Sequence, residues 1–276
     1  MPNKTISPAA AADLLSDGDV VTTSGFVGIG VPETLLKAVE ARFLETTSPQ
    51  NLTLFFAAGQ GDGKDRGLNH LAYEGLLSCV VGGHWGLIPK VGALAVENKI
   101  DAYNLPQGVI SQMFRDIAGG KPGTLSTSGL ETFVDPRKGG GKLNSRTTQD
   151  LVRLMTINGE DILFYKALPI DVALLRGTTA DTAGNVTMEN EALTIDNLSQ
   201  AMAAKSSGGV VIVQVEHVVA RGTLSPRDVV IPGAVVDAVV LAEPGDHMQT
   251  VRTAFQEHAL PKGTMMLATK MITATG

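Results

Sequence analysis

A glycine-rich loop stands between an apolar run and a helical pattern, where it could bind a ligand. The run 19–24 (DVVTTS) leads into this loop, and Pro32 follows at a position that suits the first turn of a helix. Glycines let the backbone approach a ligand closely, and a helix N-terminus behind them favours anions. A tight strand-to-helix turn would explain the same glycines without a ligand. The candidate binding residues of this loop are Gly25, Phe26, Gly28 and Gly30.

Two further segments place polar or small residues directly after an apolar run. Gln60 follows the run 51–58, and Gly83 with His84 follows the run 78–81. Ligands of α/β proteins bind where parallel strands end, so we expect these three residues in the same crevice as the glycine loop. Each also has a plain alternative: Gln60 in an ordinary loop, and His84 hydrogen-bonded beneath the neighbouring tryptophan.

The Pro-Gln-Gly turn after the run 100–104 supplies the first choice for a functional side chain. The amide of Gln107 can donate a hydrogen bond to an oxygen that gains charge during a reaction. Gly108 beside it is a further candidate for the crevice. The alternative for Gln107 is a turn amide that bonds the local backbone.

The remaining reactive side chains favour neither thiol nor metal chemistry. Cys79 is the only cysteine, and its apolar neighbours would bury it and raise the pKa of its thiol. The histidines share no metal-ligand spacing, so we predict no metal site. We therefore interpret Cys79 as a structural residue.

Composition narrows the class of protein. The chain has 276 residues, a net charge of −6 and 43% hydrophobic residues. The acidic balance argues against a dedicated nucleic-acid surface, and the apolar content argues against disorder. No apolar run is long enough for a membrane span, and no signal peptide is visible. We expect a cytoplasmic protein.

Apolar strands alternate with helical patterns over most of the chain. Helices are expected at 70–77, 87–96 and 112–118, and the strands 209–218 and 234–241 are apolar enough to be central. This alternation predicts an α/β fold with an open, mostly parallel sheet and helices on both faces.

A glycine-rich segment at 119–144 interrupts this rhythm. A long irregular segment inside a compact domain is usually functional or poorly ordered. Three cations flank its glycine triplet and could meet phosphates, although a solvated loop explains them as well. They are Arg137, Lys138 and Lys142.

Several sequence blocks together resemble the family I coenzyme A transferases. The first is DGDVVTTSGFVGIGVP at 17–32, where Ser24 replaces the first glycine of the family's Gly-Gly-Phe. The second is Pro-Gln-Gly at 106–108, and the third is TFVDPRKGGGK at 132–142, which resembles the propionate and acetate branch. LLRG at 174–177, followed by AD and GN, continues the similarity. The resemblance covers nearly the whole chain.

The resemblance implies a sugar-phosphate isomerase-like α/β fold and an enzyme of short-chain fatty acid, ketone body or propionate metabolism. Such enzymes move CoA from an acyl-CoA to a carboxylic acid. A glutamate attacks the thioester, and a glutamyl-CoA thioester forms on the way. Coenzyme A is then a substrate, and no cofactor is expected. Gln107 would donate to the acyl oxygen as it gains charge.

The nucleophilic glutamate of the family is missing from this chain. In the family it lies in a second half or a β subunit, in a Glu-x-Gly or Glu-Asn-Gly context. Glu74 lies in a helical run, Glu97-Asn98 is followed by lysine, and Glu189-Asn190 is followed by Glu191. Glu131 does not follow an apolar strand directly. We therefore expect residues 1–245 to be an α-type domain and 246–276 to be a tail or the start of a linker toward a second half. We expect a β-type half or subunit to be the partner in an oligomer. Two alternatives remain: an acyl-CoA hydrolase, and a non-catalytic acyl-CoA-binding module.

Overall fold

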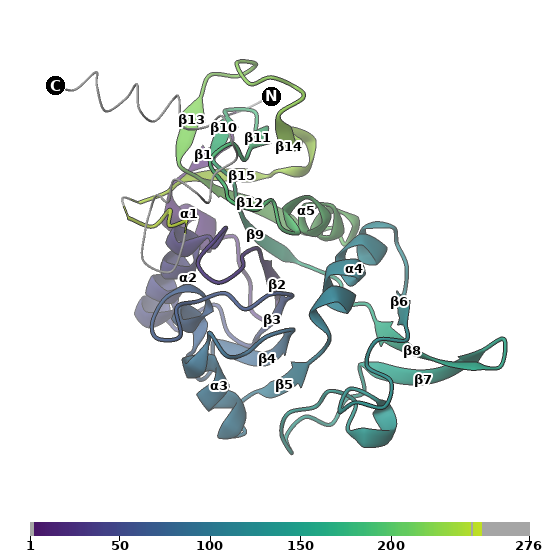
Figure 1. The fold of residues 1–276 in the computed structure, drawn as a ribbon. Helices are drawn as coiled ribbons and strands as arrows, with labels where there is room; N and C mark the ends of the chain where they lie inside the picture. The colour runs from purple at the N-terminus through teal and green to yellow at the C-terminus, as the bar shows by residue number, and fades with distance from the viewer. Residues whose placement is uncertain (1–2, 244, 250–276) are drawn as a thin grey trace.

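The protein, seen here as a computed structural model that describes residues 3–243 and 245–249, is built around one eight-stranded sheet (Figure 1). Its strand order is β1-β15-β12-β9-β2-β3-β4-β5, and every neighbouring pair is parallel. The predicted α/β fold is confirmed. The strands are β1 (Thr5–Ile6), β2 (Val20–Thr23), β3 (Leu52–Phe56), β4 (Leu77–Gly82), β5 (Asp101–Asn104), β9 (Val172–Arg176), β12 (Val210–Val215) and β15 (Ala238–Leu241).

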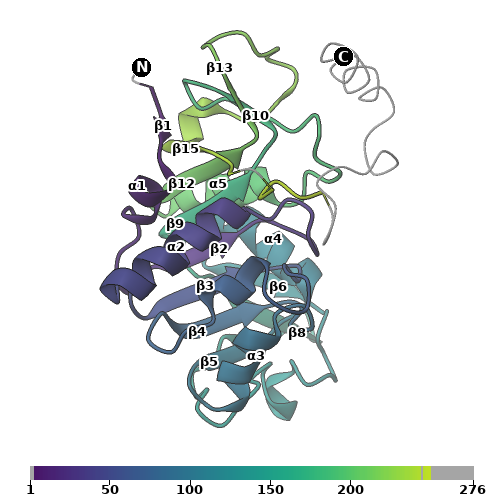
Figure 2. The same ribbon diagram turned by 90° about the vertical axis from the view of Figure 1, so that its left-hand side faces the viewer.

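Helices cover both faces of this sheet, as Figures 1 and 2 show. The helices α1 (Pro8–Ala12), α2 (Glu33–Thr46) and α3 (Pro89–Val96) pack on one face, while α4 (Gln107–Ala118) and α5 (Asn197–Ser206) pack on the other. Successive side chains of strand β3 point to opposite faces of the sheet. Leu54 and Phe56 pack with the buried side chains of α1, α2 and α3, while Phe55 packs with those of α4 and α5. Both faces are apolar because both are covered.

Two smaller sheets complete the fold. One has the order β13-β10-β11-β14, and the other is the antiparallel sheet β6-β8-β7. The segment 119–144 is therefore not irregular throughout, since it contains β6 and a 3₁₀ turn, η2. The elements are β6 (Gly123–Ser126), η2 (Pro136–Lys138), β7 (Val152–Ile157), β8 (Glu160–Lys166), β10 (Thr179–Asp181), β11 (Val186–Thr187), β13 (His217–Val219) and β14 (Val229–Ile231).

Three sequence predictions differ from the structure, one in the type of element and two in where an element begins. The helix expected at 70–77 is wrong: a 3₁₀ helix, η1 (Gly67–Leu71), is followed by a turn at Gly75 with φ +92°. Helix α4 begins five residues earlier than expected, directly after Pro106. The strand expected at 234–241 begins only at Ala238, because the 3₁₀ turn η3 (Gly233–Val235) precedes it. Within the described residues, no helix has the length and apolar character needed to cross a bilayer.

Candidate active-site crevice

The loops that carry the predicted site residues lie at one edge of the sheet. Strands β2, β3, β4 and β5 are neighbours and all run parallel, so their carboxyl ends meet there. The glycine loop 25–30 follows β2, Gln60 follows β3, His84 follows β4 and Gln107 follows β5. The structure therefore brings the four predicted segments together.

Adjacent loops at this edge touch one another through their backbones. Val27 N–H donates to the Gly59 carbonyl at 2.7 Å, and Gly61 N–H donates to the Val27 carbonyl at 2.9 Å. On the far side, a Cβ added at Gly83 would lie 2.9 Å from the Cα of Gln107. Such close approach leaves no room for a side chain, which explains why glycine stands at position 83.

The glycine loop has a tightly folded shape that depends on its residue types. Phe26 and Ile29 exchange two backbone hydrogen bonds of 2.8 and 2.9 Å, and the Ser24 hydroxyl donates to the Gly30 carbonyl at 3.0 Å. Gly25 and Gly30 have φ values of +142° and +68°, which favour glycine. Phe26 is 42% exposed, so the loop presents its aromatic ring to solvent. Gly28 is partly buried within the loop.

Gln107 is exposed at the first residue of α4, with Gly108 exposed beside it. Within the described part of the chain, the Gln107 amide has no hydrogen-bond partner, so the structure does not support a turn amide that bonds the local backbone. His84 is also exposed. The indole of Trp85 donates to the Tyr103 carbonyl at 3.2 Å rather than to His84. Both side chains are thus free to meet a ligand.

Gln60 lies at the same edge but points inward. It is only 1% exposed, and its Nε2 donates to the Thr23 carbonyl at 3.0 Å. Gln60 therefore supports the glycine loop from beneath and does not line the open side of the crevice. Its role as a ligand-binding side chain remains a prediction.

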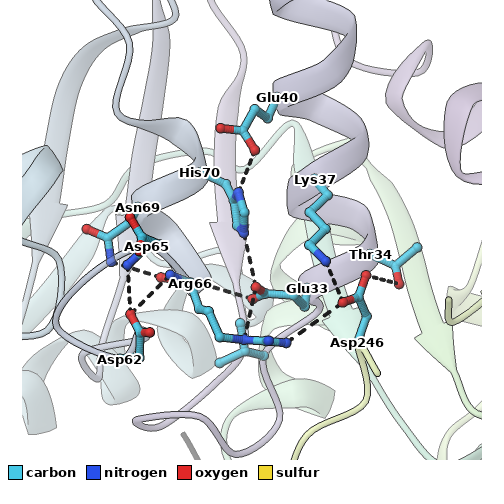
Figure 3. A network of polar contacts seen from close by, with 12 residues as sticks. Glu33, Thr34, Lys37, Glu40, Asp62, Asp65, Arg66, Asn69, His70 and Asp246 are labelled. Carbon is cyan, nitrogen blue, oxygen red and sulfur yellow. Dashed lines mark hydrogen bonds and ion pairs between the residues drawn. The ribbon is translucent and has the colours of Figure 1, made fainter. Parts of the chain in front are cut away.

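A network of charged side chains, absent from the sequence-based predictions, lies beneath the glycine loop (Figure 3). Glu33, buried at the start of α2, accepts a hydrogen bond from Gly67 N–H at 2.9 Å. His70 stands between two carboxylates, with Nε2 3.0 Å from Glu33 Oε1 and Nδ1 2.5 Å from Glu40 Oε2. Arg66 Nε lies 3.3 Å from the same Glu33 oxygen. The network joins η1 to α2.

The charges of this network shift its pKa values in opposite directions. Burial alone would raise the pKa of Glu33, but hydrogen bonds from His70 and Gly67 and the charge of Arg66 lower it below its usual value. Burial alone would lower the pKa of His70, but its bonds to Glu33 and Glu40 raise it above its usual value. Each shift favours the charged form of its group, so the two groups stabilise each other's charge.

Residues 246–249, expected to begin a linker, pack against the same region. Asp246 Oδ1 lies 2.6 Å from Lys37 Nζ, and the Asp246 carbonyl accepts from Gln214 Nε2 at 3.0 Å. The His247 ring bonds Glu191 at 2.9 Å, and Glu191 is itself paired with the buried Arg176.

Asp246 and Met248 also line a cavity of about 20 Å³ beside the glycine loop. Residues 250–276 lie outside the described residues, so the predicted domain boundary stays a prediction.

The glutamates considered as nucleophiles lie elsewhere. Glu74 and Glu97 precede β4 and β5, which places them toward the opposite, amino edge of the sheet. Glu131 lies in the segment between β6 and η2 and pairs with Arg137 and Lys138. Glu189 accepts a hydrogen bond from the Thr179 hydroxyl at 2.5 Å.

The other reactive side chains are also accounted for. Cys79 is partly buried, and burial together with the charge of Asp101 raises the pKa of its thiol to about 12. Arg137, Lys138 and Lys142 each pair with a carboxylate of the described chain. These pairs favour the solvated-loop interpretation over a phosphate site.

The fold defines a class: open parallel α/β proteins, here with the candidate site residues after the carboxyl ends of neighbouring strands. Residues 5–242 match the coenzyme A transferase family model, and the chain belongs to that family. A caffeate CoA-transferase of Acetobacterium woodii is 47% identical over 239 residues, which cover 87% of this chain and 46% of that protein. The crystal structure of the acyl-CoA transferase YdiF apoenzyme from Escherichia coli O157:H7 is 38% identical, with a TM-score of 0.86, and the match covers 94% of this chain and 49% of that one.

These matches cover only part of each longer relative. The chain spans about half the length of two curated relatives that it matches, the caffeate CoA-transferase and an acetate CoA-transferase YdiF of Escherichia coli K12. A separate subunit of similar extent also exists: the acetate CoA-transferase subunit alpha of Escherichia coli K12 is 28% identical over 244 residues, covering 88% of this chain and 99% of that subunit. The predicted resemblance to the α half of the family is thus confirmed.

Proposed function

We propose that this chain is the α part of a CoA-transferase that moves CoA between a short-chain acyl-CoA and a carboxylic acid. The observation that carries the proposal is the exposed Gln107 amide, which has no partner among the described residues and stands at the carboxyl edge of the sheet. Membership in the coenzyme A transferase family supports the class of reaction.

The chemistry divides between this chain and a β-type half. A glutamate carboxylate of the β half attacks the acyl-CoA thioester, forms an acyl-glutamyl anhydride and releases the CoA thiolate. The thiolate then attacks the glutamyl carbonyl, which frees the carboxylic acid and leaves a glutamyl-CoA thioester. The acceptor carboxylate reverses these steps and takes the CoA. Gln107 donates to the acyl oxygen while that oxygen carries negative charge.

The division of labour follows from the carboxylates of the described chain. A nucleophilic carboxylate must reach the thioester at the crevice. Glu74 and Glu97 lie toward the amino edge of the sheet, Glu131 pairs with Arg137 and Lys138, and Glu189 accepts from the Thr179 hydroxyl. These positions support a nucleophile that is supplied by the β-type half.

The proposal is tested by intact-mass spectrometry after incubation with acetyl-CoA and an acid quench. We expect no CoA adduct on this chain alone. With a β-type half added, we expect an adduct of CoA minus water on that half. A stoichiometric adduct mapped to a glutamate of this chain would overturn the proposal.

Product analysis of the same mixture separates the alternatives. A transferase forms a new acyl-CoA only when an acceptor acid is present, whereas a hydrolase releases free CoA at the same rate without one. Binding of acetyl-CoA without any turnover would identify a non-catalytic binding module instead.

A further inference from the structure

A small cavity lies behind Gly25, between the carboxyl ends of β2 and β3 and helix α5. Its volume is about 10 Å³. Thr23 and Gly25 line it from β2 and the glycine loop, Gln60 from the loop after β3, and Gln200 from α5. The exposed Gln107 does not take part in it.

Three buried polar atoms without a hydrogen bond belong to residues that line this cavity. They are Thr23 Oγ1, Gln60 Oε1 and Gln200 Oε1, and each residue is only 1% exposed. The described chain contains five such atoms in all, so more than half of them gather at one place. An unpaired buried polar group destabilises the fold because it gives up its hydrogen bonds to water and gains none in return. Three of them around one cavity point to a small polar ligand.

The hydrogen bonds of the two amides determine which atoms face this ligand. Gln60 Nε2 and Gln200 Nε2 both donate to the Thr23 carbonyl, at 3.0 and 2.8 Å, and Gln200 Nε2 also donates to the Thr22 hydroxyl at 2.9 Å. Turning either amide over would set its oxygen against the Thr23 carbonyl oxygen, acceptor against acceptor. Both amide oxygens are therefore fixed as acceptors, and no donor of the described chain meets them.

We propose that one water molecule binds in this cavity and bridges Thr23, Gln60 and Gln200. Its two hydrogens match the two amide oxygens, and its oxygen accepts from the Thr23 hydroxyl. A single water needs roughly 10–15 Å³ and two to four polar partners, and the cavity offers both. A carboxylate or thioester oxygen has no hydrogen to give to the amide oxygens, so the cavity is not a subsite for the reacting group.

The water supports the glycine loop from beneath. It links three segments that are distant in sequence and holds the Gln60 side chain close against Gly25. A Cβ at position 25 would lie only 3.0 Å from Gln60 Cγ. The inference goes beyond the proposed function and does not depend on it, because it concerns hydrogen bonds of the resting protein.

A crystal structure of the full chain that resolves ordered waters tests the proposal directly. We expect one peak within about 3.2 Å of at least two of the three atoms. An empty cavity, a peak with the short multiple oxygen contacts of a metal cation, or amides that pair with each other would each overturn it.

Variants test whether the amide oxygens hold the water. The double variant Gln60→Met with Gln200→Met keeps similar volume but removes both acceptors, so we expect the peak to be lost. Gln149→Met, at an exposed glutamine, is the matched control and should keep the peak. Thr23→Val removes only the hydroxyl, so the water should remain on the two amides. A peak that persists in the double variant would contradict the proposed hydrogen bonds.

Discussion

Gln214, in the middle of the sheet, caps a helix that lies 180 residues away in sequence. Its Oε1 accepts from Thr34 N–H at 2.9 Å and from Leu35 N–H at 3.4 Å. Helix α2 has Pro32 at its N-cap and no side-chain cap of its own, so Gln214 supplies acceptors for donors that would otherwise be unpaired. The same side chain donates to the Asp246 carbonyl, which joins the start of α2 to the segment 246–249.

Replacing this distant cap should destabilise the fold. Gln214→Leu leaves Thr34 N–H and the Asp246 carbonyl buried without partners, so we expect the free energy of unfolding to fall by about 1–3 kcal/mol. Urea denaturation measures this change. Gln149→Leu, which removes an exposed glutamine, should leave the midpoint nearly unchanged. Equal midpoints for the two variants would show that Gln214 does not act as a cap.

Removing the Gln107 amide should slow the reaction without changing the fold. Because the loss of one oxyanion donor costs on the order of 10²-fold in kcat, we expect a loss of that size for Gln107→Ala in the assembled enzyme, with KM little changed. Steady-state kinetics with a β-type half present measure both constants, and Gln149→Ala serves as the control. An unchanged kcat for Gln107→Ala would remove this residue from the mechanism.

A methyl group at position 83 should disturb the crevice. A Cβ there would collide with the Ala57 carbonyl oxygen and lie 2.9 Å from the Gln107 Cα, and both are backbone atoms that cannot easily move. We expect Gly83→Ala to destabilise by about 1–3 kcal/mol and to lower the activity of the assembled enzyme.

Gly92 in α3 is the matched control for this substitution, because a Cβ there would meet nothing within 4 Å. Gly92→Ala should raise the free energy of unfolding by roughly 0.5–1 kcal/mol, since alanine favours the helix. Thermal denaturation of both variants checks the contrast. A Gly83→Ala protein as stable as the wild type would show that the loops can separate freely.

The stability contributed by His70 should depend on pH in a defined direction. Its pKa is raised in the folded state by Glu33 and Glu40, so the protonated ring stabilises the fold most at low pH. That contribution is complete below the unfolded pKa of about 6.5 and is lost as pH rises through the folded pKa. The pKa of Glu33 is lowered in the folded state, so its ionised carboxylate stabilises the fold above its unfolded pKa. That stabilisation is lost as the pH falls through the folded pKa.

Unfolding free energies measured from pH 6 upward should therefore decline for the wild type more steeply than for His70→Gln. His217→Gln is the control, because His217 is largely exposed and faces only Glu216 at 3.8 Å. Parallel pH profiles for the wild type and His70→Gln would contradict the assigned direction.

The sequence was sufficient to predict the sheet and the edge where the candidate site residues lie. Apolar runs such as β3 and β12 report burial on both faces, which occurs in parallel sheets. Because all parallel strands end at the same edge, residues that follow β2 to β5 had to lie close together, and Gln107 and His84 do. The sequence blocks that resemble coenzyme A transferases were sufficient to predict the family, and the family match confirms that prediction.

Only the tertiary structure decided which polar side chains face inward and what they meet. Gln60 turns under the glycine loop, Gln200 reaches Thr22 across 178 residues of sequence, and Gln214 caps α2. Hydrophobic periodicity reports only which face of a local element is buried, because it contains no information on the partner that covers that face. The partners of a buried amide come from packed segments far apart in the chain, and only their packing determines them.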